Sequence, residues 1–468
     1  MGSRAKDLAR RGIRRYRLRR VWDSRMHPRM ALFAPMPPAA TGVASYSQAV
    51  LDGLRRIGFF ERHVMDVIWP PGPAHEGLVP WYRLGVYSLG NNMQYHRDLY
   101  RYACHAPGLI VLHDLALDDF VRGMKGVGDP LGFVADREAA RLAPRMRSED
   151  ALRNEPLRTP WAAHVLRRSR GVIVHSEFCR RYIEEMGSPT PVFVVPHPVV
   201  ESPADMDRAR RYARSLRAPL VAAGARTVVV APGDLNEAKR LDAVLAAVTQ
   251  LPQDVHLVLV GRRIRGYDVD RVMAESDLGA RVTLAPDVSD AGFRGWLCAA
   301  DIAVDLRFPH RGEVSGTLMR AMQAGVPTVV SATGTYLDVP TDLVVRVAPG
   351  PTDPAELAAR LRELIEDPDR RIRMGAAARE HIEHLRASEA TAHGYERAIE
   401  ETLHMVRHPA RTAEARWAGA LADIGVDEEL LRRGYGQGYA RAMEGFRTSP
   451  TAEPSAASIP PPPPAETS

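Results

Sequence analysis

The chain has 468 residues, of which 45% are hydrophobic, 26% charged and 6% aromatic, as expected for a soluble globular protein of two or three domains. The total charge of +6 is unevenly distributed, because residues 1–29 carry eleven Arg or Lys against two Asp, a net charge of +9, which leaves −3 for the remainder. The nearly neutral body excludes a protein that binds nucleic acid through its overall charge.

The three cysteines, Cys104, Cys179 and Cys298, lie far apart and form no CxxC pattern or Cys/His spacing suited to zinc. This argues against both a disulfide framework and a structural metal. No apolar run approaches the ~18–20 residues of a membrane-spanning helix, and the basic N-terminus lacks the apolar core of a secretory signal. We expect a soluble protein in the cytoplasm.

Two interpretations stay open for the basic arm, residues 1–29. It is either a solvated, partly helical extension or a segment that contacts an anionic membrane, which would place the protein peripherally at the inner membrane face. Only Tyr16 and Trp22 interleave its arginines, so nucleic acid is not expected as a partner.

After the arm, short apolar runs alternate with amphipathic helical stretches. The strands predicted in the first half are Met30–Ala34, Leu84–Leu89, Leu109–His113, Val172–His175 and Phe193–Val195, with helices over Val43–Leu54 and Tyr95–Ala103. The strands predicted in the second half are Thr227–Ala231, His256–Val260, Val282–Ala285, Ile302–Asp305 and Thr328–Ser331, with a helix over Lys239–Leu251. Continuous Val/Ile/Leu runs indicate strands that are covered on both faces, as in parallel sheets.

This pattern predicts an α/β protein with two Rossmann-like, doubly wound halves. The expected divisions are a basic arm (1–29), an acceptor-side domain (30–200), a donor-binding domain (201–385), C-terminal helices that partly pack back on the first domain (386–447) and a disordered Pro-rich tail (448–468). Because ligands bind beyond the carboxyl ends of parallel strands, we expect the site in a cleft between two facing sheets.

Polar loops follow the first predicted strands of both halves. In the first half a Pro-rich loop ends at Gly42 and opens a helix, whose positive end suits an anion or a hydroxyl. In the second half Gly233 leads to Lys239 and Arg240, which the pattern places in the first turn of a helix. Two cations at a helix start are unfavourable, and Lys239 is one of three lysines in the chain, so the pair indicates a bound diphosphate.

Three further segments place polar groups at predicted strand ends. The loop after Ile302–Asp305 holds Glu313, which suits sugar hydroxyls, and the helix start at Ser315–Leu318, which offers free N–H groups. In the first half the polar residues after two neighbouring strands are Asn91, Asn92, His96, His113 and Asp114. An Asp268-Val269-Asp270 pair has metal-binding spacing, but it opens a surface helix. No metal and no resident cofactor are expected.

Taken together, these segments resemble glycosyltransferase family 4, a group of enzymes with the GT-B fold, over roughly residues 30–400. The matching pieces are P-x-P-x-x-x-G, GNN…H, LHD, VIVHSEF, VPHPV, APGDLNEAKRLDAVLAAV, LVLVG and GEVSGTLMRAMQAGVPTVVS. The resemblance implies transfer of a sugar from a nucleoside-diphosphate sugar, with retention of configuration at the anomeric carbon.

The resemblance also implies roles for individual residues. Lys239 contacts the donor diphosphate and His113 lies by the transferred sugar, so His113, Glu313 and Lys239 are the expected catalytic residues. The expected donor-binding residues are Gly42, Gly233, Lys239, Arg240, Glu313, Ser315, Gly316, Thr317, Leu318 and Arg320. The expected acceptor-side residues are Asn91, Asn92, His96 and Asp114.

The sequence departs from the family pattern at two places. Asp234 stands where a basic residue usually assists the lysine, and Arg240 is the nearest substitute. The usual pair of glutamates falls on Gly312 and Arg320; Glu313 lies one step from the first place, and the second has no carboxylate for the ribose hydroxyls.

The function that follows is a retaining hexosyltransferase acting on a glycan, glycolipid or other envelope precursor. The expected mechanism is same-face attack by the acceptor hydroxyl, whose proton passes to the departing phosphate. The alternative is a catalytically weak homologue that binds a sugar nucleotide or a partner protein, as the departure at Arg320 suggests.

Overall fold

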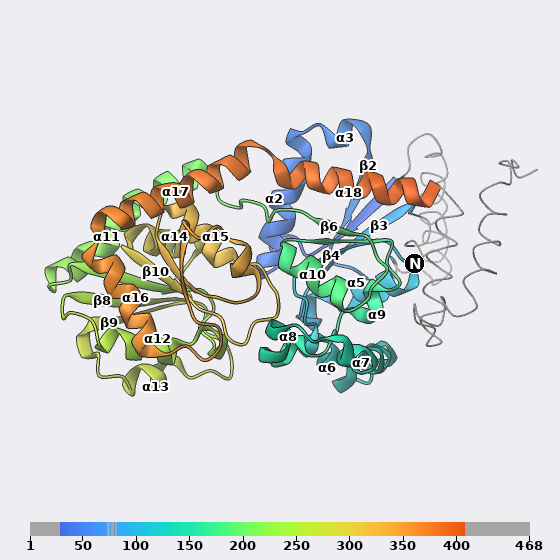
Figure 1. The fold of residues 1–468 in the computed structure, drawn as a ribbon. Coiled ribbons are helices and arrows are strands. Elements are labelled where there is room, and N and C mark those ends of the chain that lie inside the picture. Colours follow the sequence, from blue (N-terminus) through green and yellow to red (C-terminus); the bar gives the residue numbers. More distant parts are fainter. Residues whose placement is uncertain (1–28, 73–74, 76–78, 80–81, 408–468) are drawn as a thin grey trace, which may run out of the picture. The chain divides into compact units, whose positions relative to one another are not determined.

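The computed structural model describes residues 29–72, 75, 79 and 82–407. The basic arm except for Arg29, the residues after 407 and the predicted Pro-rich tail lie outside the described residues. Residues up to Leu403 belong to one compact unit that contains both sheets (Figure 1). Among the helices of the described part of the chain, none is both long and apolar enough to cross a bilayer.

The first sheet is parallel, with strand order β2-β1-β3-β4-β5-β6. Its strands are β1 (Arg29–Phe33), β2 (Val64–Ile68), β3 (Leu84–Leu89), β4 (Leu109–Leu112), β5 (Gly171–Val174) and β6 (Val192–Val194). The direction of winding reverses between β1 and β3, where Met30 pairs with Leu84. A ligand site of an open parallel sheet lies at such a reversal.

The second sheet is also parallel, with strand order β12-β11-β10-β7-β8-β9. Its strands are β7 (Thr227–Pro232), β8 (Val255–Gly261), β9 (Val282–Pro286), β10 (Ile302–Asp305), β11 (Thr328–Ser331) and β12 (Val344–Val347). Here the reversal falls between β7 and β10, so the loops after these two strands flank the expected ligand position.

Helices cover both faces of each sheet, because alternate residues of every strand point to opposite sides. One face of the first sheet packs on α5 (Met93–His105), α6 (Asp118–Gly126), α7 (Pro130–Leu142), α9 (Ala163–Leu166) and α10 (Glu177–Glu185), and the other on α2 (Gly42–Arg56), α3 (Phe59–Arg62) and α18 (Ala390–Arg407). The second sheet lies between α12 (Leu241–Thr249), α13 (Val269–Ala274) and α16 (Pro354–Glu366) on one face and α11 (Pro203–Ala222), α14 (Asp290–Ala299) and α15 (Gly316–Ala324) on the other. α17 (Pro368–Ala387) packs against α15.

The chain returns to the first sheet through α18, which buries Ala392, Tyr395 and Ile399 beside α2 (Figure 1). The hydroxyl oxygens of Tyr46 and Tyr395 lie 2.6 Å apart. Ion pairs between the two segments follow the edge of this contact, including Arg56–Glu389. The apolar seam carries the association, since exposed ion pairs contribute little.

Ile399→Ala is therefore expected to lower the free energy of unfolding by about 2–5 kcal/mol, the usual cost of truncating a buried aliphatic side chain. Ile399 is 1% exposed. The neighbouring Glu400, whose side chain is 52% exposed, is the matched control, and its replacement by alanine should stay within about 0.5 kcal/mol. Urea unfolding of the two variants compares them; equal losses would contradict this account of α18.

Candidate functional site

The loops at the carboxyl ends of the two sheets touch one another. The backbone N–H groups of Leu115 and Ala116, just after β4, both donate to the carbonyl of Arg311, after β10, at 2.9 and 3.1 Å. On the other side Arg262, after β8, donates to the carbonyl of Ala40 in the loop between β1 and α2, at 3.2 Å. We call this meeting of loops the junction.

A buried ion pair lies at the reversal point of the second sheet. Lys239 is 7% exposed and its ammonium contacts Asp305, the last residue of β10, which is fully buried. Asp305 also accepts hydrogen bonds from Ser315 (2.6 Å) and Tyr336 (2.8 Å). Burial lowers the pKa of Lys239, while Asp305 opposes that shift, so the carboxylate is what keeps the lysine a cation.

Glycine is required next to this pair. At Gly233, which has φ 117°, a Cβ atom would lie 2.9 Å from the Lys239 Nζ and 3.2 Å from the Thr317 hydroxyl. The structure thus brings together Gly233, Lys239 and the first turn of α15, as the sequence predicted for the donor side. Ser315 caps that helix by accepting from the Leu318 N–H at 3.2 Å.

The predicted position of Arg240 is corrected by the structure. Lys239 ends a short 3-10 turn, Glu237–Lys239, and α12 begins only at Leu241, because Arg240 adopts a left-handed conformation with φ 51°. Arg240 Nη2 lies 2.7 Å from Asp242 Oδ2, so its charge is directed to a carboxylate on its own helix.

Another arginine stands beside the departure at Asp234. Arg262 makes two hydrogen bonds of 2.9 Å to the Asp234 carboxylate and reaches Ala40 with its third nitrogen. Arg262 was not among the predicted site residues, although Gly261-Arg262-Arg263 stands at the end of β8, a strand that neighbours β7.

Glu313 is held inside its own loop. Its carboxylate contacts Arg307, whose side chain is 19% exposed, and accepts the backbone N–H of Arg311 at 2.7 Å. Burial would raise the pKa of Glu313, but the charge and hydrogen bond of Arg307, together with a backbone hydrogen bond, lower it below its usual range. Arg307 was also missed by the sequence analysis, although it follows β10 by two residues.

In the first half, three histidine rings surround Tyr46. Their centroids lie 4.7 Å (His113), 5.1 Å (His175) and 5.1 Å (His197) from the tyrosine ring. Burial lowers the pKa of His113 well below its usual value, and His175 lowers it further. The imidazole is therefore neutral at pH 7 and serves as a hydrogen-bonding group; one nitrogen lies 2.7 Å from the Ser88 hydroxyl.

The other acceptor-side candidates have distinct places. His96 is buried and its Nδ1 lies 3.0 Å from the Ser88 carbonyl; burial lowers its pKa to about 4. Asn92 caps α5 through the Gln94 N–H at 2.9 Å. The backbone N–H of Asn91 donates to Asp114 at 2.8 Å. Gly42 opens α2, and an added Cβ there would meet no atom within 4 Å.

Burial, and after it the charge of Glu313 across the junction, raise the pKa of Asp114 to about 7. The unfolded chain loses this proton near pH 4, whereas the folded protein keeps it up to about pH 7. Stability therefore falls as the pH rises between these values.

Asp114→Asn is expected to raise the free energy of unfolding by up to about 4 kcal/mol at pH 8 and to give no gain at pH 4. Denaturant unfolding at both pH values checks this; an equal gain at both would contradict it.

Arg320, predicted on the donor side, is tied to a carboxylate from another element. Its Nε lies 2.9 Å from Glu201 Oε1, and the other oxygen of Glu201 lies 2.7 Å from Arg294. Glu201 is 4% exposed. The charge of Arg320 is thus balanced within the protein by Glu201, which precedes α11 and belongs to no predicted site.

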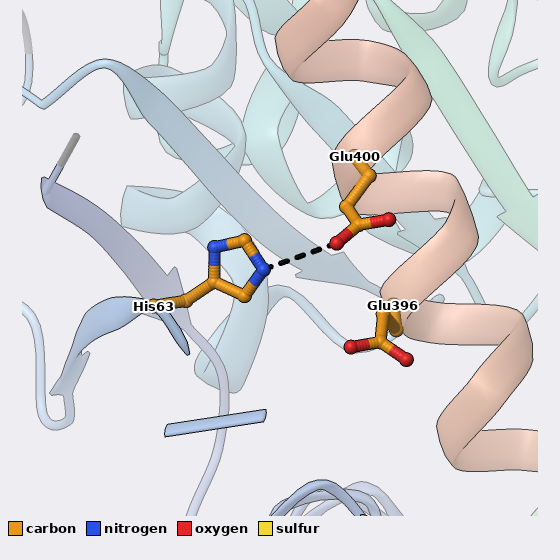
Figure 2. A group of neighbouring side chains, drawn as sticks. All are labelled: His63, Glu396 and Glu400. Atoms are coloured by element: carbon orange, nitrogen blue, oxygen red, sulfur yellow. Dashed lines mark hydrogen bonds and ion pairs between the residues drawn. The ribbon is translucent and has the colours of Figure 1, made fainter. Parts of the chain in front are cut away.

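One group of possible metal ligands occurs among the described residues: His63, Glu396 and Glu400, whose ligand atoms lie within 4.8 Å of one another (Figure 2). His63 Nε2 is 3.2 Å from Glu400 Oε1, and Glu396 pairs with Arg62. His63 precedes β2, so this group lies at the amino edge of the sheet, away from the junction. The arginine already neutralises one carboxylate, and the group is better described as part of the contact between α3 and α18.

An apolar cavity of about 610 Å³ adjoins the loop after β1, and sequence analysis gave no indication of it. It is lined by Met36, Pro37, Pro38, Ala39, Val67, Trp69 and Pro70. The Tyr95 hydroxyl donates to the carbonyl of Ala40 at 3.5 Å, and the Trp69 and Tyr95 rings lie 6.3 Å apart. The cavity therefore lies on the first-sheet side of the junction.

Residues 214–381 match the family model described as Glycosyl transferases group 1. The D-inositol 3-phosphate glycosyltransferase of Xylanimonas cellulosilytica is 29% identical over 157 residues, 32% of this chain. The chain spans 37% of that relative's length.

Two solved structures share the fold across both sheets. Sucrose-phosphate synthase from Thermosynechococcus elongatus superposes with a TM-score of 0.56 at 18% identity, over 80% of this chain and 99% of that chain. Anabaena HepE, solved in complex with UDP and glucose, gives a TM-score of 0.54 at 17% identity, over 81% and 99%. The predicted α/β architecture of two parallel-sheet domains, the GT-B fold, is confirmed.

Proposed function

We propose that this protein is a retaining glycosyltransferase that moves a hexose from a nucleoside-diphosphate sugar to a hydroxyl of a glycan, glycolipid or related envelope precursor. The observation that carries the proposal is the placement of Lys239 beside the first turn of α15 at the reversal point of the second sheet. Cations and free backbone N–H groups at one point are what a diphosphate requires.

The leaving diphosphate is the part of the reaction that most needs help. As the bond between the anomeric carbon and the phosphate oxygen breaks, negative charge grows on the phosphate, and fixed donors stabilise it. We assign this role to Lys239 and to the N–H groups of Gly316 and Thr317, since the Leu318 N–H already donates to the Ser315 hydroxyl. We assign the second cationic contact to Arg262 in place of Arg240, because Arg262, which is paired with Asp234, also reaches across the junction to the carbonyl of Ala40, whereas Arg240 is directed to Asp242 on α12. These groups would act without a metal.

The transferred sugar would lie between the two halves. His113, neutral because it is buried, can hydrogen-bond a sugar hydroxyl, and Glu313 offers a carboxylate from the opposite side. Same-face attack by the acceptor hydroxyl, with its proton passing to the departing phosphate, would retain the configuration. Domain closure would exclude water from this step.

The proposal also names the co-substrate, the place of the acceptor and the location of the protein. HepE binds UDP, which supports a sugar nucleotide as co-substrate here. The apolar cavity beside the β1–α2 loop would receive part of the acceptor. A cytoplasmic location, with the basic arm at the inner membrane face, fits a lipid-linked acceptor and remains part of the proposal.

The test is turnover of UDP-, GDP- and ADP-hexoses with pooled glycan and glycolipid acceptors. Nucleoside diphosphate release identifies the donor, and proton NMR of the new glycosidic bond gives its configuration. The proposal predicts one preferred base and an anomeric configuration equal to that of the donor. Inversion would overturn the retaining mechanism, and tight donor binding without turnover on any acceptor would favour a weak homologue.

A further inference from the structure

We propose that Asp150 is a positioning residue which, through His310, holds the loop that carries Glu313. The helical segment between β4 and β5, which includes α8 (Glu149–Arg153), would then set the geometry of the donor side from the opposite half of the molecule. The inference rests on the proposed function for its catalytic consequence, and on the contacts of the loop for its structural one.

His310 has a defined tautomer. Its Nδ1 accepts the backbone N–H of Gly312 at 3.2 Å, so the ring proton lies on Nε2. That nitrogen is 2.8 Å from Asp150 Oδ2 and donates to it. The imidazole is 3% exposed, and an unpaired N–H at this depth would be costly.

Asp150 receives a second hydrogen bond from the half of the chain that contains the second sheet and His310. The Thr333 hydroxyl, after β11, donates to Asp150 Oδ1 at 2.7 Å. Both carboxylate oxygens of a residue on α8 are therefore occupied by donors from the second-sheet half. Next to it, the buried Asn154 accepts the backbone N–H of His310 at 3.3 Å, so the ring and the backbone of His310 are both held.

The two residues after His310 are also held from the first half. Arg311 donates to Asp118 of α6 at 2.8 and 3.2 Å, and the Gly312 carbonyl accepts the Cys179 thiol at 3.2 Å. Glu313 is different: its carboxylate is bonded only within its own loop, to Arg307 and to the Arg311 N–H, as far as the described contacts show.

The position of the Glu313 carboxylate therefore follows from the backbone at residues 310–312. Removing the Asp150 carboxylate leaves the His310 Nε2–H without its partner and frees that backbone to shift. A displacement near 1 Å at a reacting centre costs on the order of 10²-fold in rate. Asp150 would act in this way without touching the sugar.

The first experiment measures the loop directly. Hydrogen exchange of peptides spanning residues 308–318 is compared in Asp150→Ala and in Glu149→Ala, the matched control, whose side chain is 75% exposed and pairs only with Arg153 among the described residues. We expect these peptides to exchange at least about tenfold faster in Asp150→Ala than in wild type, because local opening sets the rate. In the control the exchange rate should equal that of wild type. Unchanged exchange in Asp150→Ala overturns the proposal, whatever the donor turns out to be.

The second experiment measures the consequence for turnover. We expect Asp150→Ala to lower kcat/KM for the donor on the order of 10–100-fold, Asp150→Asn, which keeps an acceptor for Nε2–H, to lose less, and Glu149→Ala to match wild type. In a Glu313→Gln background Asp150→Ala should cause no further loss, since it acts through that residue. Independent, multiplicative losses overturn the positioning role.

If Asp150→Ala does not fold, the exchange and turnover of Asp150→Asn decide. A wild-type protein that turns over no sugar nucleotide refutes the proposed function instead, while the exchange result still decides the contact.

Discussion

Replacing Lys239 with methionine is expected to reduce turnover of the sugar nucleotide on the order of 10²–10³-fold, as for other groups that stabilise charge developing in a transition state. The same change should lower the free energy of unfolding by about 3–5 kcal/mol, because it leaves a buried carboxylate without its cation. That carboxylate belongs to Asp305, which is fully buried. Steady-state kinetics and urea unfolding measure the two effects.

A double variant separates them. In Lys239→Met/Asp305→Asn the remaining amide is neutral and can still accept from Ser315 or Tyr336, which donate to Asp305 in the wild type. Stability should recover for most of its loss, while turnover should stay low because the cation is still missing. A double variant with wild-type turnover would contradict the role of Lys239 at the diphosphate.

Gly312→Ala is expected to have the second-largest effect. Gly312 has φ 77°, where an L-residue costs about 1–2 kcal/mol, and an added Cβ would lie 2.5 Å from a methyl carbon of Leu115, across the junction. Overpacking of this kind adds about 1–3 kcal/mol. Because the clash falls between the two halves and one residue before Glu313, we expect turnover to fall at least tenfold.

Two further variants show whether the loss of turnover in Gly312→Ala comes from the clash. Gly126→Ala in α6, where an added Cβ meets nothing within 4 Å, should leave turnover unchanged. Leu115→Ala in the Gly312→Ala background should recover part of the lost turnover by removing the clash, leaving the backbone cost. Kinetics of the three proteins check the account, and wild-type turnover in Gly312→Ala would refute it.

The central strands were predictable because they carry continuous apolar runs. β3, β10 and β11 have the predicted bounds, and the bounds of the other predicted strands differ by one residue at one or both ends. The two strands that were missed, β2 and β12, lie at sheet edges. Each carries a charged residue, Asp66 or Arg346, within a short segment. The charged residue interrupts the apolar run of each strand, so neither gives a continuous hydrophobic signal.

The candidate site residues could be proposed from the sequence, but the ion pairs among them could not. Loops after strands gave Gly233, Lys239 and Glu313, because parallel strands end at the same edge of a sheet. Arg262 was missed because its partner, Asp234, follows a neighbouring strand, and strand order is a property of the fold. Arg240 was misplaced because its left-handed conformation delays the start of α12.

Contacts between the two halves lie further beyond sequence reasoning. Asp150 and His310 are 160 residues apart in the chain, and neither stands in a recognisable motif with the other. Asp150 lies in the helical segment between β4 and β5. Its contact with the loop of Glu313 is visible only when both sheets are present.

The most direct test of the central claim is calorimetric titration of UDP, GDP and ADP into three proteins: wild type, Lys239→Met/Asp305→Asn and the control Glu400→Ala on the distant amino edge. We predict that one nucleotide binds the wild type and the control equally, and that its affinity falls on the order of 10²-fold in the double variant, as expected when a charge-assisted contact is lost. Equal affinity for the wild type and the double variant, or no binding of any of the three nucleotides, would contradict a donor site at Lys239.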